Sequence, residues 1–199
     1  EIVHKILNDI GRKIKKINLI ILSDFNYGML SQTLVDNIIK LAKDNKVLIV
    51  ADSQSSSQNG DISRFSNVEL VTPTEREARM GLQDFTGGLV NLAENLRKKI
   101  NAKHVFITLG HEGFLIHTKT KKIQSWENDL IPAINSFPKD PAGGGDALLV
   151  VSSLALATKC SIWEAAFLGS VAAACQVDRI GNMPLNTNEI MHEVNRQLI

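Results

Sequence analysis

Three consecutive glycines stand between two aspartates in the stretch DPAGGGDALL, at residues 140–149. Glycines allow several backbone N–H groups to turn toward one point, and a helix that starts at Asp146 would add the positive end of its dipole. Gly143, Gly144 and Gly145 therefore resemble an anion hole. From the glycines alone, a flexible loop with an aspartate as helix N-cap is an equally good interpretation.

Asp146 favours the chemical interpretation. A carboxylate beside a pocket for a negatively charged group is poorly placed unless it handles a proton or a cation. A general base for a hydroxyl that attacks a phosphoryl group would lie there, with the glycine amides stabilising charge on the transferred group. The stretch matches neither GxGxxG nor GxxxxGK[ST], so neither a Rossmann nor a Walker phosphate site is indicated.

Continuous apolar runs separated by helical patterns predict an α/β fold that positions these residues. Runs without polar alternation are typical of parallel strands covered on both faces, and they occur at residues 18–23, 46–51, 68–72 and 104–110. In such sheets ligands bind beyond the carboxyl ends of the strands, where the polar turns SDFNYG, ADSQ and TPTERE are expected. Each turn alone is weak evidence, since polar loops follow most strands.

The remaining patterns predict helices and one hairpin. The hairpin arms are expected at residues 113–117 and 121–125. Apolar periodicity and small-residue content predict the helices, at residues 3–14, 31–44, 88–99, 146–158, 161–177 and 188–198, with a further helix start at Pro73 and Thr74.

Composition excludes several classes of function. The chain of 199 residues fits one domain, and 22 Lys and Arg against 21 Asp and Glu leave a formal charge of +1, which gives no reason to expect nucleic acid or an anionic membrane as partner. No apolar run approaches a bilayer span and no signal peptide is evident, so we expect a cytoplasmic protein that binds small molecules. Cys160 and Cys175 are expected to be core thiols. His104, His111 and His117 lack metal-ligand spacing and are expected to have surface or packing roles.

Several motifs together resemble one family. The stretch from Asp140 to Asp146 resembles the D-T-x-G-x-G-D signature of the ribokinase-like (PfkB-type) carbohydrate kinases. ILSDFNYG is similar to that family's S-D-Y-x-K-G turn, ELVTPTEREA to its T-P-N-x-x-E segment, and VFITLGHEGFLI to its T-x-G-x-x-G nucleotide loop. Order and spacing agree from about residue 18 to the end, and RIGNMPL adds a likeness to the heptose-phosphate kinase domain of bifunctional heptose kinase/adenylyltransferases.

The resemblance implies a three-layer α/β/α fold with a mainly parallel central sheet. Residues 1–199 would form a single ribokinase-like kinase domain that is incomplete at its N-terminus, because the family's kinases carry about a hundred further residues there. That portion supplies much of the sugar pocket and a lid often used for homodimer formation. This chain would be the C-terminal, nucleotide-binding portion, with an exposed sheet edge and little kinase activity on its own.

The resemblance also implies a role for each matching residue in an ATP-dependent phosphotransferase acting on a sugar or sugar-phosphate hydroxyl. Asp146 would be the catalytic base, and the amides of Gly143, Gly144 and Gly145 the anion hole. Asp24 would contact the acceptor together with Asp146. Ser170 would lie near the adenine. The rest of the ATP site would be lined by Thr74, Thr108, Gly110 and Gly113.

Two cations belong to the same set of expectations. Glu77 would organise Mg²⁺ through water, which suits a hard cation with oxygen ligands. A monovalent cation such as K⁺ would be held beside the anion hole by five backbone carbonyls, those of Asp140, Ala142, Gln176, Arg179 and Gly181.

Three departures from the family pattern keep alternatives open. Thr74 replaces an asparagine, Tyr27 replaces a lysine, and ADSQ stands where the heptose kinases have a D-P-K stretch. Two lysines that could neutralise phosphate are thus absent, which weakens the case for a sugar-phosphate acceptor. A catalytically weakened nucleotide-binding or regulatory module, or a kinase for a nucleoside or another hydroxyl metabolite, are the alternatives.

Overall fold

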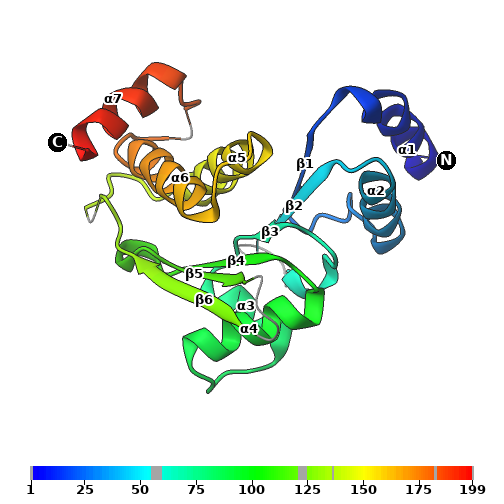
Figure 1. Ribbon diagram of the computed structural model, residues 1–199, viewed down its shortest axis with the longest axis horizontal. Helices are drawn as coiled ribbons and strands as arrows, with labels where there is room; N and C mark the ends of the chain where they lie inside the picture. Colours follow the sequence, from blue (N-terminus) through cyan, green and yellow to red (C-terminus); the bar gives the residue numbers. More distant parts are fainter. Residues whose placement is uncertain (1, 55–59, 121–124, 136, 182, 199) are drawn as a thin grey trace.

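The computed structural model describes residues 2–54, 60–120, 125–135, 137–181 and 183–198. Its described strands form one sheet in the order β1-β2-β3-β4-β5-β6 (Figure 1). The first four strands are parallel, and β5 and β6 add an antiparallel hairpin. Their bounds are β1 Leu19–Asp24, β2 Leu48–Ser53, β3 Leu70–Val71, β4 His104–Thr108, β5 Phe114–Lys119 and β6 Trp126–Ile131.

Helices cover both faces of this sheet. The helices are α1 Ile2–Lys13, α2 Gln32–Asp44, α3 Glu75–Leu82, α4 Leu89–Ile100, α5 Gly144–Ala157, α6 Ile162–Val177 and α7 Thr187–Gln197. One core cluster joins α2, α3 and α4 to the sheet, and a second joins α5 and α6 to its opposite face. In Figure 1 these two groups of helices lie on either side of the strands. The predicted three-layer, mainly parallel α/β/α fold is confirmed.

Strand β2 shows why its sequence has no polar alternation. Ile49 and Ala51 belong to the cluster with α2 and α4, whereas Val50 belongs to the cluster with α5 and α6. Successive side chains of a strand point to opposite faces, so a strand with helices on both sides must be apolar throughout. The buried polar residues Asp52 and Ser53 follow at its carboxyl end.

The pair α5 and α6 is apolar nearly all round and packs through small residues. A Cβ added to Gly169 would lie 2.1 Å from Ser152 Oγ and 3.0 Å from the Leu148 carbonyl oxygen, so the two helix backbones approach each other closely there. The Ser152 hydroxyl donates to the Ala165 carbonyl across the same contact, at 3.0 Å. Helix α6 begins with a capping box made by Ser161 and Glu164.

The second hairpin arm differs from its predicted position. Residues 121–124 of the predicted arm lie outside the described residues, and the strand that pairs with β5 is β6, which begins after Ser125. The apolar-run criterion missed β6 because Trp126–Ile131 is an edge strand with mostly exposed side chains, and an edge strand needs no buried face. At the opposite edge of the sheet lies β1.

The predicted packing roles of two histidines are confirmed. His117 is fully buried and its Nε2 lies 2.8 Å from Glu94 Oε2, while His104 Nδ1 lies 2.6 Å from the Thr118 hydroxyl. Cys160 and Cys175 are free thiols and only partly buried, so the expectation of core positions was too strong. Over the part of the chain that the structure describes, none of the helices combines the length and apolar character needed to cross a bilayer.

Candidate active site

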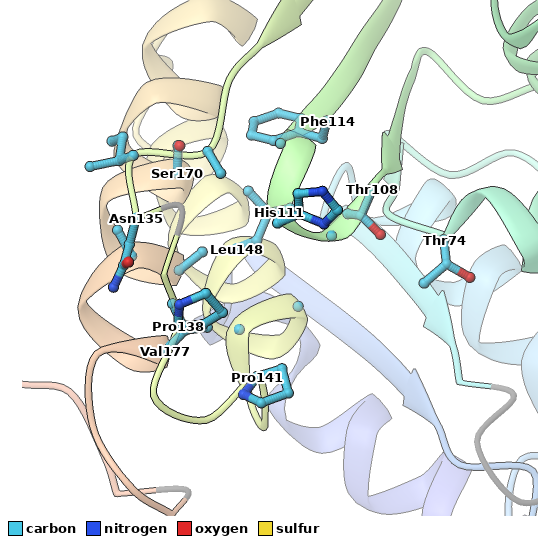
Figure 2. Close-up of a pocket in the computed structure, with 18 residues that line it drawn as sticks. Thr74, Thr108, His111, Phe114, Asn135, Pro138, Pro141, Leu148, Ser170 and Val177 are labelled. Atoms are coloured by element: carbon cyan, nitrogen blue, oxygen red, sulfur yellow. The ribbon is translucent and has the colours of Figure 1, made fainter.

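A cavity of about 340 Å³ lies between the β4–β5 turn and the helices α5 and α6, and we call it the main pocket (Figure 2). Figure 2 shows Thr74 and Thr108 on the side of the strands and Ser170 and Val177 on the side of the helices. Seven residues singled out from the sequence line it, namely Thr74, Thr108, Gly110, Gly113, Gly144, Gly145 and Ser170. The structure thus brings these residues to one cavity from four separate parts of the chain.

His111, Phe114, Leu148 and a loop segment complete much of this lining, and sequence reasoning had not assigned them to a site. His111 stands in the β4–β5 turn, where we expected an ordinary surface or packing role. Phe114 and Leu148 give one end of the pocket an apolar wall, and both belong to the core cluster under α5 and α6. The loop contributes Ala133, Ile134, Asn135, Pro138 and Pro141.

The glycine run begins α5 two residues earlier than predicted. Gly143 is the N-cap, with a left-handed φ of 78° that favours glycine, and Gly144 and Gly145 form the first turn. N–H groups in the first turn of a helix have no intrahelical acceptor and lie at the positive end of the helix dipole. Gly144 and Gly145, two of the three predicted anion-hole residues, line the main pocket, and the Gly144 N–H contacts the Pro141 carbonyl oxygen at 3.3 Å.

Asp146 follows in the same turn, half-buried, and burial raises the pKa of its carboxyl group. Its Oδ1 accepts a hydrogen bond from Gln54 Nε2 at 3.1 Å. Gln54 is itself fixed, because its N–H donates to the Asp24 carbonyl at 2.9 Å and its carbonyl accepts from Asn26 Nδ2 at 2.5 Å. The carboxyl ends of β1 and β2 therefore hold a neutral amide against the candidate base.

Replacing Gln54 by leucine should raise the pKa of Asp146 further, because the amide stabilises the ionised carboxylate that burial disfavours. The measurement is a pH titration of the Asp146 carboxyl ¹³C signal, assigned with Asp146→Asn. Gln32→Leu is the matched control, since Gln32 donates to the exposed Asp36 and to the Arg64 backbone carbonyl but not to Asp146. An unchanged titration in Gln54→Leu would show that the bond does not orient the base in solution.

Asp52, at the end of β2, is a site residue that the sequence interpretation missed. Burial raises its pKa to about 7, and the negative charges of Glu77 and Asp146 act in the same direction. Its Oδ1 is buried without a hydrogen-bond partner. The only sequence signal was its place in the ADSQ turn. We had compared that turn with the D-P-K stretch of the heptose kinases only to note the missing lysine.

Glu77 is buried in the first turn of α3, where its side chain forms a hydrogen bond that caps the helix. Its Oε2 accepts the Thr74 N–H at 2.8 Å, and the Thr74 hydroxyl accepts the Glu77 N–H, so the two form a capping box. Within the described ranges, no group of three His, Cys, Asp or Glu side chains could hold a metal ion by itself. Asp52 and Glu77 nevertheless fit a magnesium ion that takes most of its ligands from phosphate and water, as Mg²⁺ commonly does.

Asp52→Asn should stabilise the free protein at alkaline pH. A carboxyl group whose folded pKa lies near 7, above its ordinary 3.8, contributes nothing below about pH 4 and costs stability increasingly up to pH 7. Since one pKa unit corresponds to about 1.4 kcal/mol, the gain at pH 8 is at most roughly 4 kcal/mol. Urea unfolding at pH 4 and pH 8 measures it, with the exposed Asp36→Asn as control, and an equal effect at both pH values would contradict the prediction.

Asp24, the predicted acceptor contact, is buried at the end of β1. Its Oδ1 accepts the Asn26 N–H at 3.0 Å, and its Oδ2 lies 3.3 Å from Arg64 Nη2. Arg64 also donates to the Leu30 carbonyl. These bonds fix the turn that follows β1, and a contact between Asp24 and an acceptor stays a prediction.

The five residues predicted to surround a monovalent cation do come together. Asp140 Oδ2 accepts the Gly181 N–H at 2.9 Å, and its Oδ1 accepts the Ala142 N–H at 3.0 Å, which lowers the pKa of Asp140. The Arg179 N–H contacts the Gln176 carbonyl at 3.4 Å. However, the Gln176 side chain points its Nε2 at two of the expected ligands, the carbonyls of Ala142 and Gly181, at 3.5 Å each.

The family model for pfkB family carbohydrate kinases matches residues 7–188, which include every element from β1 to β6 and the whole of the site. The chain belongs to the pfkB family of carbohydrate kinases. The expectation drawn from the motifs is therefore confirmed at the level of the family.

Curated relatives of this pfkB chain include two bifunctional HldE proteins. The chain is 27% identical over 190 residues to HldE of Aliarcobacter butzleri, and the match covers 94% of this chain and 37% of that protein. It is 29% identical over 188 residues to HldE of Helicobacter pylori, covering 93% and 38%. The chain thus spans well under half the length of these relatives.

Solved structures show the same fold at lower identity. Phosphofructokinase-2 from Escherichia coli in complex with potassium has a TM-score of 0.77 and 15% identity, over 97% of this chain and 62% of that one. Ribokinase of Arabidopsis thaliana complexed with ribose and ATP has a TM-score of 0.76 and 16% identity, over 94% and 59%. These likenesses bear on the fold of the pfkB chain.

Proposed function

We propose that this chain is the nucleotide-binding portion of an ATP-dependent kinase that phosphorylates a hydroxyl of a sugar or sugar phosphate. The observation that carries the proposal is the arrangement at the start of α5. There, Asp146 stands next to Gly144 and Gly145, whose backbone lines the main pocket opposite Thr108 and Gly110. A candidate base therefore directly follows a backbone segment that borders the cavity and could stabilise an anion.

The main pocket accounts for the nucleotide. Its apolar end, with Phe114, Leu148 and the partly polar Ser170, suits a purine ring, and its glycine end suits phosphates. ATP supplies the phosphoryl group that is transferred. The α5 amides stabilise negative charge on that group, and Asp146 accepts the proton of the attacking hydroxyl through its carboxylate, which Gln54 holds in place.

Asp52 and Glu77 are the residues that would hold Mg²⁺ near the phosphates. The unpartnered Oδ1 of Asp52 and the mutual repulsion among these carboxylates both favour a cation beside them. Bound Mg²⁺ would neutralise phosphate charge in the transfer step.

The acceptor class rests on the relatives named HldE and on the residues at the ends of β1 and β2. Those ends present Asn26 and Gln54, and the arginine nearby, Arg64, is engaged by Asp24. An uncharged sugar suits these groups better than a sugar that already carries a phosphate. Nucleosides and other hydroxyl metabolites therefore belong in the test panel.

A nucleotide-binding module without catalysis is the second candidate, and Thr74 favours it. The threonine stands where the family motif has an asparagine, and its hydroxyl is engaged in capping α3. Such a module would bind nucleotide in the same pocket.

One experiment separates the two functions. Calorimetric titration with Mg-ATP is followed by an ADP-release assay with sugars, sugar phosphates and nucleosides, on this chain and on the complete open reading frame that encodes it. We expect ATP binding by both and ADP release by the complete protein with a sugar-type acceptor. Binding without turnover on any acceptor would favour the module, and absence of ATP binding would refute both functions.

A further inference from the structure

The Gln176 side chain lies where the sequence motifs had predicted a monovalent cation. Gln176 is on α6, only 3% exposed, and its Nε2 is 3.5 Å from the Ala142 carbonyl oxygen and 3.5 Å from the Gly181 carbonyl oxygen. An amide nitrogen offers two N–H donors and no acceptor. Two carbonyls that would have to point at a cation thus already face a donor.

The side chains of two further residues of this set are also bonded within the protein. Both carboxylate oxygens of Asp140 accept backbone N–H groups, from Ala142 and Gly181. The permanently charged guanidinium of Arg179 lies at the same end of α6, with its Nε 3.3 Å from the Cys175 carbonyl oxygen and its Nη2 3.0 Å from Glu189 Oε1. A cation bound to the Ala142 and Gly181 carbonyls would have to displace the Gln176 amide.

These bonds connect the glycine run to the end of α6. Ala142 immediately precedes Gly143, the N-cap of α5, and Gly181 lies in the turn after α6. The Asp140 N–H also contacts the Val177 carbonyl, at 3.2 Å. The backbone that leads into the anion hole is therefore joined to α6 and to the turn after it by hydrogen bonds within the protein.

We propose that the Gln176 amide takes the place of a monovalent cation, so that this chain positions its glycine run without K⁺ or Na⁺. Phosphofructokinase-2 from Escherichia coli, which has the same fold, is known in complex with potassium, so K⁺ is the ion to test first. The inference rests on the proposed function only for the role of the loop. Its test uses stability and ATP binding, which do not require phosphoryl transfer.

The test compares KCl, NaCl and choline chloride at equal ionic strength. Wild-type protein should unfold at the same temperature in all three salts and bind Mg-ATP with the same affinity. Gln176→Ala removes the donor and leaves room beside the freed carbonyls, and Gln176→Glu replaces the donor by an oxygen of the same shape. Both variants should bind Mg-ATP at least about fivefold more tightly in KCl than in choline chloride, a usual coupling between two ligand sites.

Each outcome decides the proposal. Stabilisation of the wild type by K⁺ over choline, or tighter ATP binding in K⁺, would overturn it, because the cation site would then be intact. Variants that fold and stay insensitive to the salt would also overturn it, since the amide would not be standing in for an ion. If both variants fail to fold in every salt, the wild-type comparison still decides.

Discussion

Asp146→Asn should abolish phosphoryl transfer by the complete protein and leave Mg-ATP binding nearly intact. Asparagine keeps the shape of the side chain and can still bond to Gln54, but it cannot accept the proton of an attacking hydroxyl. Loss of a positioned base lowers kcat by roughly 10²–10⁴-fold. The nucleotide contacts that we propose come from residues that line the main pocket, and Asp146 is not one of them, so the ATP dissociation constant should change little.

The measurement pairs an ADP-release assay with calorimetry on the same protein samples. Asp178→Asn is the control, because Asp178 is an exposed carboxylate after α6 whose partner is Lys139 at 3.2 Å. Turnover retained in Asp146→Asn would remove Asp146 from the role of base. Lost turnover together with lost ATP binding would instead assign Asp146 to the nucleotide site.

Gly113→Ala should destabilise the protein strongly and damage the main pocket. Gly113 has a φ of 100°, and an added Cβ would lie 2.0 Å from the Ile131 carbonyl oxygen and 2.7 Å from the Ala133 nitrogen. Both atoms are backbone and cannot turn away. Left-handed strain and steric overlap each cost about 1–3 kcal/mol, so we expect a loss of roughly 3–5 kcal/mol.

Gly110→Ala in the same turn separates the two contributions. Gly110 also has a positive φ, of 64°, but an added Cβ there would meet nothing within 4 Å. Gly110→Ala should therefore lower the free energy of unfolding only by the conformational strain, about 1–2 kcal/mol. Urea unfolding of both variants measures the difference, and equal losses would show that the contact with Ile131 and Ala133 relaxes freely.

Local pattern was enough to predict most of the fold. Parallel strands such as β2 are apolar on both faces, and helices α3 and α6 begin at capping residues that can be read directly, Thr74 and Ser161. Strand β6 escaped because its side chains are exposed at the sheet edge. A strand held mainly by backbone pairing leaves little hydrophobic signal.

The site was predictable where a motif lies within one short stretch and not where it depends on distant contacts. The glycine run and Thr108 could be found because they are local. The bond between Gln54 and Asp146 joins residues 92 positions apart, and the pKa of Asp52 depends on burial and on neighbours from other elements. Gln176 could be placed near the loop, but the direction of its amide required coordinates.

The close contact of Gly169 with Ser152 affects the shape of the main pocket. Because Ser152 and Leu148 of α5 already fill the space beside Gly169, any larger residue at position 169 would have to push the two helices apart. The main pocket is bordered by both helices, through Ser170, which follows Gly169 on α6, and through Gly145 in the first turn of α5. The close contact at Gly169 therefore helps to set the separation of the two helices that border the cavity.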